Sequence, residues 1–111
     1  MPEMKDSDMY RALRMGDVAS FNAARESGEM PDLENADLRA CDLRGADLEG
    51  VSLTGAYLKL SDLRGVDLRS CDLEGASLHS ARISGVYFPD ELDPHEIMMS
   101  VHYGTRLRLS R

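Results

Sequence analysis

A leucine, or a residue that replaces it, occupies every fifth position from residue 31 to residue 89. Two positions before each one stands a small residue, most often alanine, and twelve consecutive units keep this register without an insertion. The large members of the series are Leu33, Leu38, Leu43, Leu48, Leu53, Leu58, Leu63, Leu68, Leu73, Leu78, Ile83 and Phe88.

A period of five does not fit either regular secondary structure. In an α-helix the leucines would step by about 140° and spread around the whole surface. In a straight strand an odd spacing would place successive leucines on opposite faces. The pattern is consistent only if the chain bends once per unit and turns every leucine toward one shared interior. Bends repeated in the same sense generate stacked coils, so the sequence predicts a solenoid.

Three of the units resemble the A(D/N)LXX repeat of pentapeptide-repeat proteins. They are ADLRA at residues 36–40, ADLEG at 46–50 and CDLEG at 71–75. The resemblance implies an all-β solenoid, namely a right-handed quadrilateral β-helix with four repeats per coil and about three coils here. Residues twenty apart should then stack on one another, as in the series Leu33, Leu53 and Leu73.

The segments on either side of the repeat read as helical, and the whole chain reads as one structural domain. Residues 1–30 predict an irregular start followed by helices at 8–15 and 18–27, a cap over the first coil. Residues 31–89 form the repeat shaft. Residues 90–111 predict a helix from Pro94 to His102 or Tyr103, with Gly104 as its stop, and then an extended tail.

The C-terminal segment admits two interpretations. It can fold over the third coil as a second lid, or it can meet its copy in a homodimer, which its large apolar surface favours. Resemblance to some pentapeptide-repeat proteins also implies dimerisation through this end. The residues concerned are Ile97, Met98, Val101 and Leu107.

The chain shows no motif for catalysis, metal binding or cofactor binding, so we expect no enzyme, no metal and no cofactor. The three histidines are scattered along the sequence. The recurrent aspartates belong to the repeat, one per unit, and are expected to hydrogen-bond at the corners instead of binding calcium. Cys41 and Cys71 are expected to point inward on different walls, so we expect neither a disulfide between them nor a nucleophilic role.

Stacking with a period of twenty sorts the outward residues onto four walls. One wall is acidic, and Glu74 is expected to be exposed there. The third wall is expected to form a ladder of alternating charge from the stacked pairs Asp42/Arg44, Asp62/Arg64 and Arg82/Ser84. The second wall carries the only outward group with apolar surface, which makes it the candidate partner surface: Tyr57, Lys59, Leu60 and His79.

A net charge of −7 argues against a general nucleic-acid binder or a binder of anionic membranes. No signal peptide or membrane-spanning run is visible, and buried free thiols suit a reducing compartment, so we expect a cytoplasmic protein. The favoured function is a non-catalytic protein–protein interaction module that presents a rigid acidic surface. The alternative comes from the resemblance: some family members mimic DNA and modulate DNA gyrase, although three coils make a short mimic.

Overall fold

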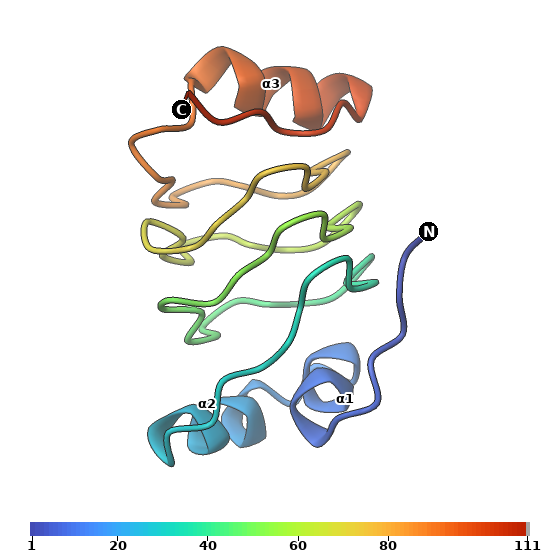
Figure 1. Cartoon of the computed structure of the whole chain (residues 1–111), viewed down its shortest axis with the longest axis vertical. Coiled ribbons are helices and arrows are strands. Elements are labelled where there is room, and N and C mark those ends of the chain that lie inside the picture. Colours follow the sequence, from blue (N-terminus) through green and yellow to red (C-terminus); the bar gives the residue numbers. More distant parts are fainter. Residues whose placement is uncertain (111) are drawn as a thin grey trace.

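The computed structural model describes residues 1–110, and it places three helices at the two ends of a stack of coils (Figure 1). Helices α1 (Asp8–Arg14) and α2 (Val18–Glu26) lie together below the first coil. Helix α3 (Pro94–Tyr103) lies across the opposite end. The predicted helices are therefore confirmed to within a residue at each end.

Parallel bridges between residues twenty apart join one coil to the next, which confirms the predicted stacking. They define four walls: the first wall is residues 31–35, 51–55 and 71–75, and the second is 36–40, 56–60 and 76–80. The third wall is residues 41–45, 61–65 and 81–85, and the fourth is 46–50, 66–70 and 86–90. The bridges are Asp37↔Tyr57, Tyr57↔Ser77, Asp42↔Asp62, Asp62↔Arg82, Ser52↔Asp72 and Asp67↔Tyr87.

Each wall has one bridged position per coil, because the chain turns a corner every five residues. Pairing therefore takes the form of isolated bridges and no continuous strand is formed within residues 1–110. Backbone hydrogen bonds reinforce every bridge: the Leu63 N–H donates to the Arg82 carbonyl at 2.9 Å, and the Asp62 N–H donates to the Cys41 carbonyl at 2.9 Å. The shaft is held by many short ladders of this kind.

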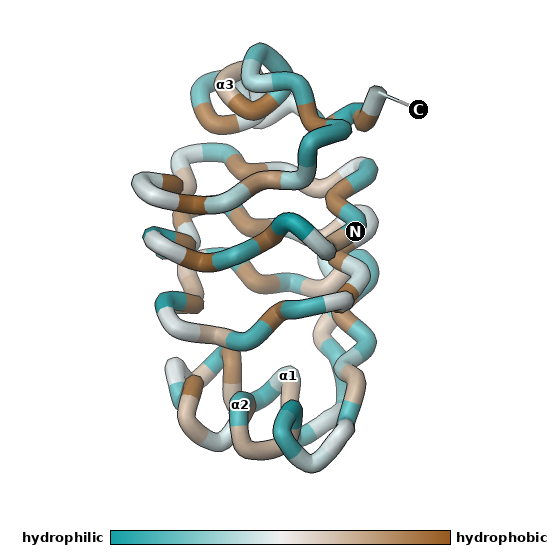
Figure 2. The backbone as a smooth tube through the Cα atoms, turned by 90° about the vertical axis from the view of Figure 1, so that its left-hand side faces the viewer, coloured by the Kyte–Doolittle hydropathy of each residue, from teal (hydrophilic) through white to brown (hydrophobic). Residues whose placement is uncertain are grey.

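The leucines fill the interior of the stack. All ten from Leu33 to Leu78 are at most 1% exposed, whereas Ile83 and Phe88 in the last coil are half-buried. Figure 2 shows this as brown positions that alternate with polar ones along every coil. Burial of a leucine side chain contributes roughly 1.5–3 kcal/mol, so this column is the main source of stability.

The corners combine a left-handed backbone with a side-chain hydrogen bond. The third wall uses Gly45, Gly65 and Gly85 there, with φ values of 79°, 76° and 73°. The carboxylate of Asp42 accepts the Arg44 N–H at 3.2 Å, and most other units repeat this contact. The repeated aspartates therefore make the corner hydrogen bonds that the sequence predicted.

The first residues of the chain close part of the lower edge of the stack. The Glu3 N–H donates to the Asn35 carbonyl and the Glu3 carbonyl accepts the Asp37 N–H, both at 2.8 Å. The prediction of an irregular start is therefore wrong for this part of the chain. Free backbone groups at a coil end are costly when they are buried without partners, and the bridge from Glu3 to Ala36 supplies partners here.

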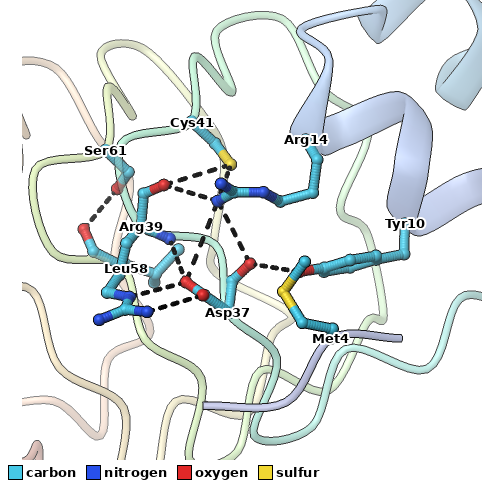
Figure 3. A network of polar contacts seen from close by, with 8 residues as sticks. All are labelled: Met4, Tyr10, Arg14, Asp37, Arg39, Cys41, Leu58 and Ser61. Atoms are coloured by element: carbon cyan, nitrogen blue, oxygen red, sulfur yellow. Dashed lines mark hydrogen bonds and ion pairs between the residues drawn. The ribbon is translucent and has the colours of Figure 1, made fainter. Parts of the chain in front are cut away.

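Side chains from α1 and α2 cover more of the same edge. Figure 3 shows Tyr10 and Arg14 reaching the first coil, where the Tyr10 hydroxyl donates to the Asp37 carbonyl at 2.7 Å. Arg14 Nη1 donates to the Arg39 carbonyl at 2.6 Å. On the fourth wall the Asn22 amide oxygen accepts the Asp47 N–H at 2.8 Å and so takes the place of the carbonyl group that a further coil would supply.

The C-terminal segment covers the opposite edge by the same means. The Ser100 hydroxyl on α3 accepts the Leu78 N–H at 2.8 Å, and the Val101 carbonyl accepts the Ser80 N–H at 2.9 Å. The tail after α3 runs antiparallel to the third coil, where Leu107 is bonded to Gly75 and to Ala76. Within residues 1–110, no helix is long and apolar enough to cross a membrane.

The Tyr10 hydroxyl should contribute to stability as a partner of the first coil. Tyr10 is 1% exposed, so Tyr10→Phe leaves the Asp37 carbonyl without this buried donor and should lower the free energy of unfolding by about 1–2 kcal/mol. Urea denaturation measures this change in the free energy of unfolding. Tyr103→Phe is the matched control, because Tyr103 is 74% exposed. Equal stabilities for the two variants would contradict the edge-closing role of Tyr10.

Candidate protein-interaction site

The four residues predicted as an outward cluster separate into two pairs. Lys59 and Leu60 are exposed, whereas Tyr57 and His79 are half-buried. Arg106 of the tail stacks on the Tyr57 ring at 5.0 Å, and its Nη2 donates to the Tyr57 hydroxyl at 2.6 Å. The tail therefore covers part of the second wall, a surface that was predicted to face outward.

His79 is covered by the end of α3. A Cβ added to Gly104 would lie 3.2 Å from the His79 ring, which shows how closely the two residues pack. Gly104 has a φ of 75° and ends α3 in the left-handed conformation. Tyr57 and His79 thus belong to the lid contact, and Lys59 and Leu60 remain available to a partner.

Leu60 lies at the corner between the second and third walls with a φ of 61°, and its side chain is 58% exposed. The left-handed conformation costs a residue with a Cβ roughly 1–2 kcal/mol. The chain uses glycine at the equivalent corners of the same coil at Gly55 and Gly65. Ala40 and Ser80, which stack below and above Leu60, also have a positive φ but are small. Leu60 is the one large apolar side chain among these strained corners of the described chain.

The third wall next to Leu60 carries a ladder of ion pairs. Arg64 donates two hydrogen bonds to the Asp62 carboxylate, at 2.9 and 2.7 Å, and Arg44 approaches the same carboxylate from the coil below at 3.4 Å. The hydrogen bonds from Arg64 lower the pKa of Asp62 to about 2. This confirms the predicted alternation of charge and keeps Asp62 ionised.

Two cations near Leu60 have no such partner. Lys59 precedes Leu60 on the second wall, and Arg82 stands one coil above Asp62 on the third wall. Within residues 1–110, neither has a carboxylate within 4.0 Å. Arg82 was predicted as a member of the ladder, and the structure places it there without a carboxylate partner among the described residues. The available signal was an arginine at a position where the repeat normally has aspartate. Lys59, Leu60 and Arg82 are called the Leu60 corner from here on.

Charge is distributed unevenly around the stack. The second and third walls carry five basic side chains and three acidic ones, whereas the first and fourth carry one basic and eight acidic ones. On the second and third walls these are Arg39, Arg44, Lys59, Arg64 and Arg82 with Asp37, Asp42 and Asp62. On the first and fourth they are Arg69 with Asp32, Glu34, Asp47, Glu49, Asp67, Asp72, Glu74 and Asp90.

The acidic first wall is partly covered by the two ends of the chain. Glu74 is half-buried and its carboxylate accepts the Leu109 N–H at 2.9 Å, so the expectation of an exposed Glu74 is wrong. At the other end Lys5 lies 3.5 Å from the Asp32 carboxylate. Acidic surface remains exposed at Asp32 and Glu34 and continues onto the fourth wall at Asp47 and Glu49.

The C-terminal residues considered for a lid or a dimer are placed largely against their own core. Ile97 and Leu107 are 8% and 1% exposed, and Val101 is half-buried. Met98 is 46% exposed and faces outward. The lid interpretation accounts for the buried members, and homodimerisation stays a prediction.

Neither cysteine is placed for chemistry. Burial raises the pKa of the Cys71 thiol to about 11, and burial likewise raises the pKa of Cys41. Both are free thiols, and Cys41 accepts a contact from Arg14 (Figure 3). Within residues 1–110, no group of three or more histidine, cysteine or acidic side chains is arranged to hold a metal ion.

The stacked coils of five-residue units define a repeat protein built on inward leucines. The family model of pentapeptide repeats matches residues 32–69 and 56–89 with eight copies, and the chain belongs to this family. No curated protein and no solved structure matches the chain.

The strain at Leu60 can be measured directly. Leu60→Gly removes the strain of a side chain at positive φ, which stabilises the folded state. Glycine also raises the entropy of the unfolded chain, which opposes this gain, so the free energy of unfolding should stay constant or rise by about 1 kcal/mol. The matched control is Gly65→Leu at the next corner of the same coil. A Cβ at Gly65 meets no atom within 4 Å, and Gly65→Leu adds the strain while it removes the chain entropy of glycine, so the free energy of unfolding should stay constant or fall by about 1 kcal/mol. If Leu60→Gly instead loses more than about 1 kcal/mol, Leu60 serves the fold.

Proposed function

We propose that the protein is a non-catalytic protein–protein interaction module and that the Leu60 corner is its partner-binding surface. The stack of coils supplies a rigid support, and the two lids supply hydrogen-bond partners to the backbone groups at its ends. The chemistry of the surface is an exposed leucine beside two free cations. A protein contact needs this combination of apolar area and flanking charge, and catalysis does not.

The observation that carries the proposal is the exposed, strained leucine. A corner in this stack needs only a residue that tolerates positive φ, and glycine meets that need at lower cost. Leu60 adds an apolar side chain at the position where the fold gains least from it. Residues with a strained backbone concentrate at functional sites, so the strain at Leu60 points to a function for its side chain.

The support beneath Leu60 favours binding without rearrangement. The Leu60 N–H donates to the His79 carbonyl at 2.9 Å, and the Ala40 N–H below donates to the Lys59 carbonyl at 2.8 Å. The corner is thus fixed from the coil above and the coil below. A preorganised surface loses little entropy on binding, which improves affinity for a given contact area.

Two further expectations belong to this proposal. We infer that the stack is the right-handed quadrilateral β-helix that the family resemblance implies, since four bridged walls repeat every twenty residues.

Homodimerisation would add a second copy of the Leu60 corner, with Met98 as an exposed apolar contact on the lid. A DNA mimic needs continuous negative charge, and no observation favours it here, because the second and third walls carry a positive surplus.

Site-specific photocrosslinking tests the proposed surface. A photoreactive amino acid replaces Leu60 in the full chain, which is expressed in its native cells and irradiated. The expected result is a discrete adduct with a protein partner. The control carries the same group at Met15, which is 82% exposed on the N-terminal lid and should give no such adduct. The same adducts from both positions, or none from position 60, would refute the proposal.

A further inference from the structure

We propose that the partner of the Leu60 corner is an acidic protein segment that presents apolar side chains between its carboxylates. This proposal rests on the function proposed above and specifies the chemistry of the partner. Its basis is the pairing of one exposed leucine with two unneutralised cations on a protein that is otherwise strongly acidic.

The two cations differ from their neighbours in availability. Arg39 and Arg64 each hold an aspartate of their own unit at 2.8 and 2.7 Å, so their charge is largely spent within the wall. Lys59 and Arg82 are exposed and have no ion pair within residues 1–110. A free surface cation gains more from an incoming carboxylate than one that is already paired, because no existing contact is broken.

The positions of these cations define what fits. Lys59 extends from the second wall and Arg82 from the third wall, so they flank the corner at which Leu60 stands. A segment that places apolar groups over Leu60 must therefore pass between two positive charges. Carboxylates on both sides of its apolar groups satisfy that geometry, and basic or uncharged flanks do not.

The first and fourth walls disfavour the same partner. The first and fourth walls carry eight acidic side chains against one basic, and they meet at the corner diagonally opposite Leu60. Among the four walls, an acidic segment is repelled there and attracted to the second and third. Charge of opposite sign on opposite sides of one protein orients the encounter and gives specificity more than affinity.

Titration with designed peptides tests the proposal. The probe is a fluorescein-labelled amphipathic peptide of two heptads with leucine on one face and glutamate on both flanks, and its matched control has glutamine in place of glutamate. Fluorescence anisotropy gives the dissociation constant. Amide shifts in ¹⁵N NMR spectra locate the binding site and should center on Lys59, Leu60 and Arg82. Binding of the glutamate peptide should weaken as salt is raised from about 20 to about 200 mM.

Three charge reversals of equal size assign the effect. Lys59→Glu and Arg82→Glu should each weaken binding of the glutamate peptide by about tenfold, since each removes an attraction and adds a repulsion. Arg11→Glu makes the same change in net charge on the N-terminal lid, where Arg11 pairs with Asp6 and Asp8, and should change binding less than about twofold. Thermal unfolding confirms that each variant is folded.

The outcomes separate this proposal from the broader function. Equal binding of the glutamine peptide would overturn the acidic partner and leave an apolar interaction surface in place. Binding of neither peptide at the Leu60 corner would also overturn it, while crosslinking at position 60 decides the function independently. Tighter binding of a labelled single-stranded oligonucleotide, lost in Lys59→Glu and Arg82→Glu, would assign the corner to phosphate and overturn the protein partner.

Discussion

Backbone hydrogen bonding between one coil and the next, which pairs residues twenty apart, is the constraint on which the rest of the molecule depends. Every five residues the chain turns, so each coil offers its neighbour only a few donors and acceptors per wall. Such short ladders are weak singly and must all be made together. The inward leucines supply the energy that holds the coils in register, because a shift by one residue would place them in water.

The same constraint explains the two ends. A coil at the end of the stack has unpaired backbone groups, and the chain pairs many of them with its own residues. Glu3 pairs through its backbone, and Tyr10, Arg14, Asn22 and Ser100 pair through their side chains. The segments that do this also cross the outer walls, and this decides which surface is left. Arg106 covers Tyr57, and Gly104 covers His79, whereas Leu60 stays exposed.

Much of this architecture could be predicted because the repeat is a local signal with a long-range consequence. The period of five indicated which residues face inward. The period of twenty, which indicated which residues stack, came from the resemblance to pentapeptide-repeat proteins and its implied four repeats per coil. The helix ends followed from their caps, such as Asp93 with Pro94 at the start of α3 and Gly104 at its end. The corner role of the aspartates followed from their recurrence at one fixed position of the five-residue unit.

The contacts of the two terminal segments could not be predicted, because they depend on where a flexible end meets a distant coil. Glu3, Arg106 and Leu109 carry no periodic pattern that names their partners. For that reason the candidate surface was drawn too wide, with Tyr57 and His79 included, and Glu74 was taken as exposed. Arg82 was missed because its place in the repeat suggested a ladder partner, and only the structure shows that Asp62 is already held by Arg64 and Arg44.

Native-state hydrogen exchange tests the stacking most directly. The amides of Leu58 and Leu63 in the middle coil donate to Ser77 and Arg82 of the coil above, both at 2.9 Å. If the coils form one cooperative unit, these amides should exchange only through global unfolding and show the full free energy of unfolding measured in urea. Exchange at the rate of exposed amides, in a protein that remains folded, would contradict the pairing of residues twenty apart.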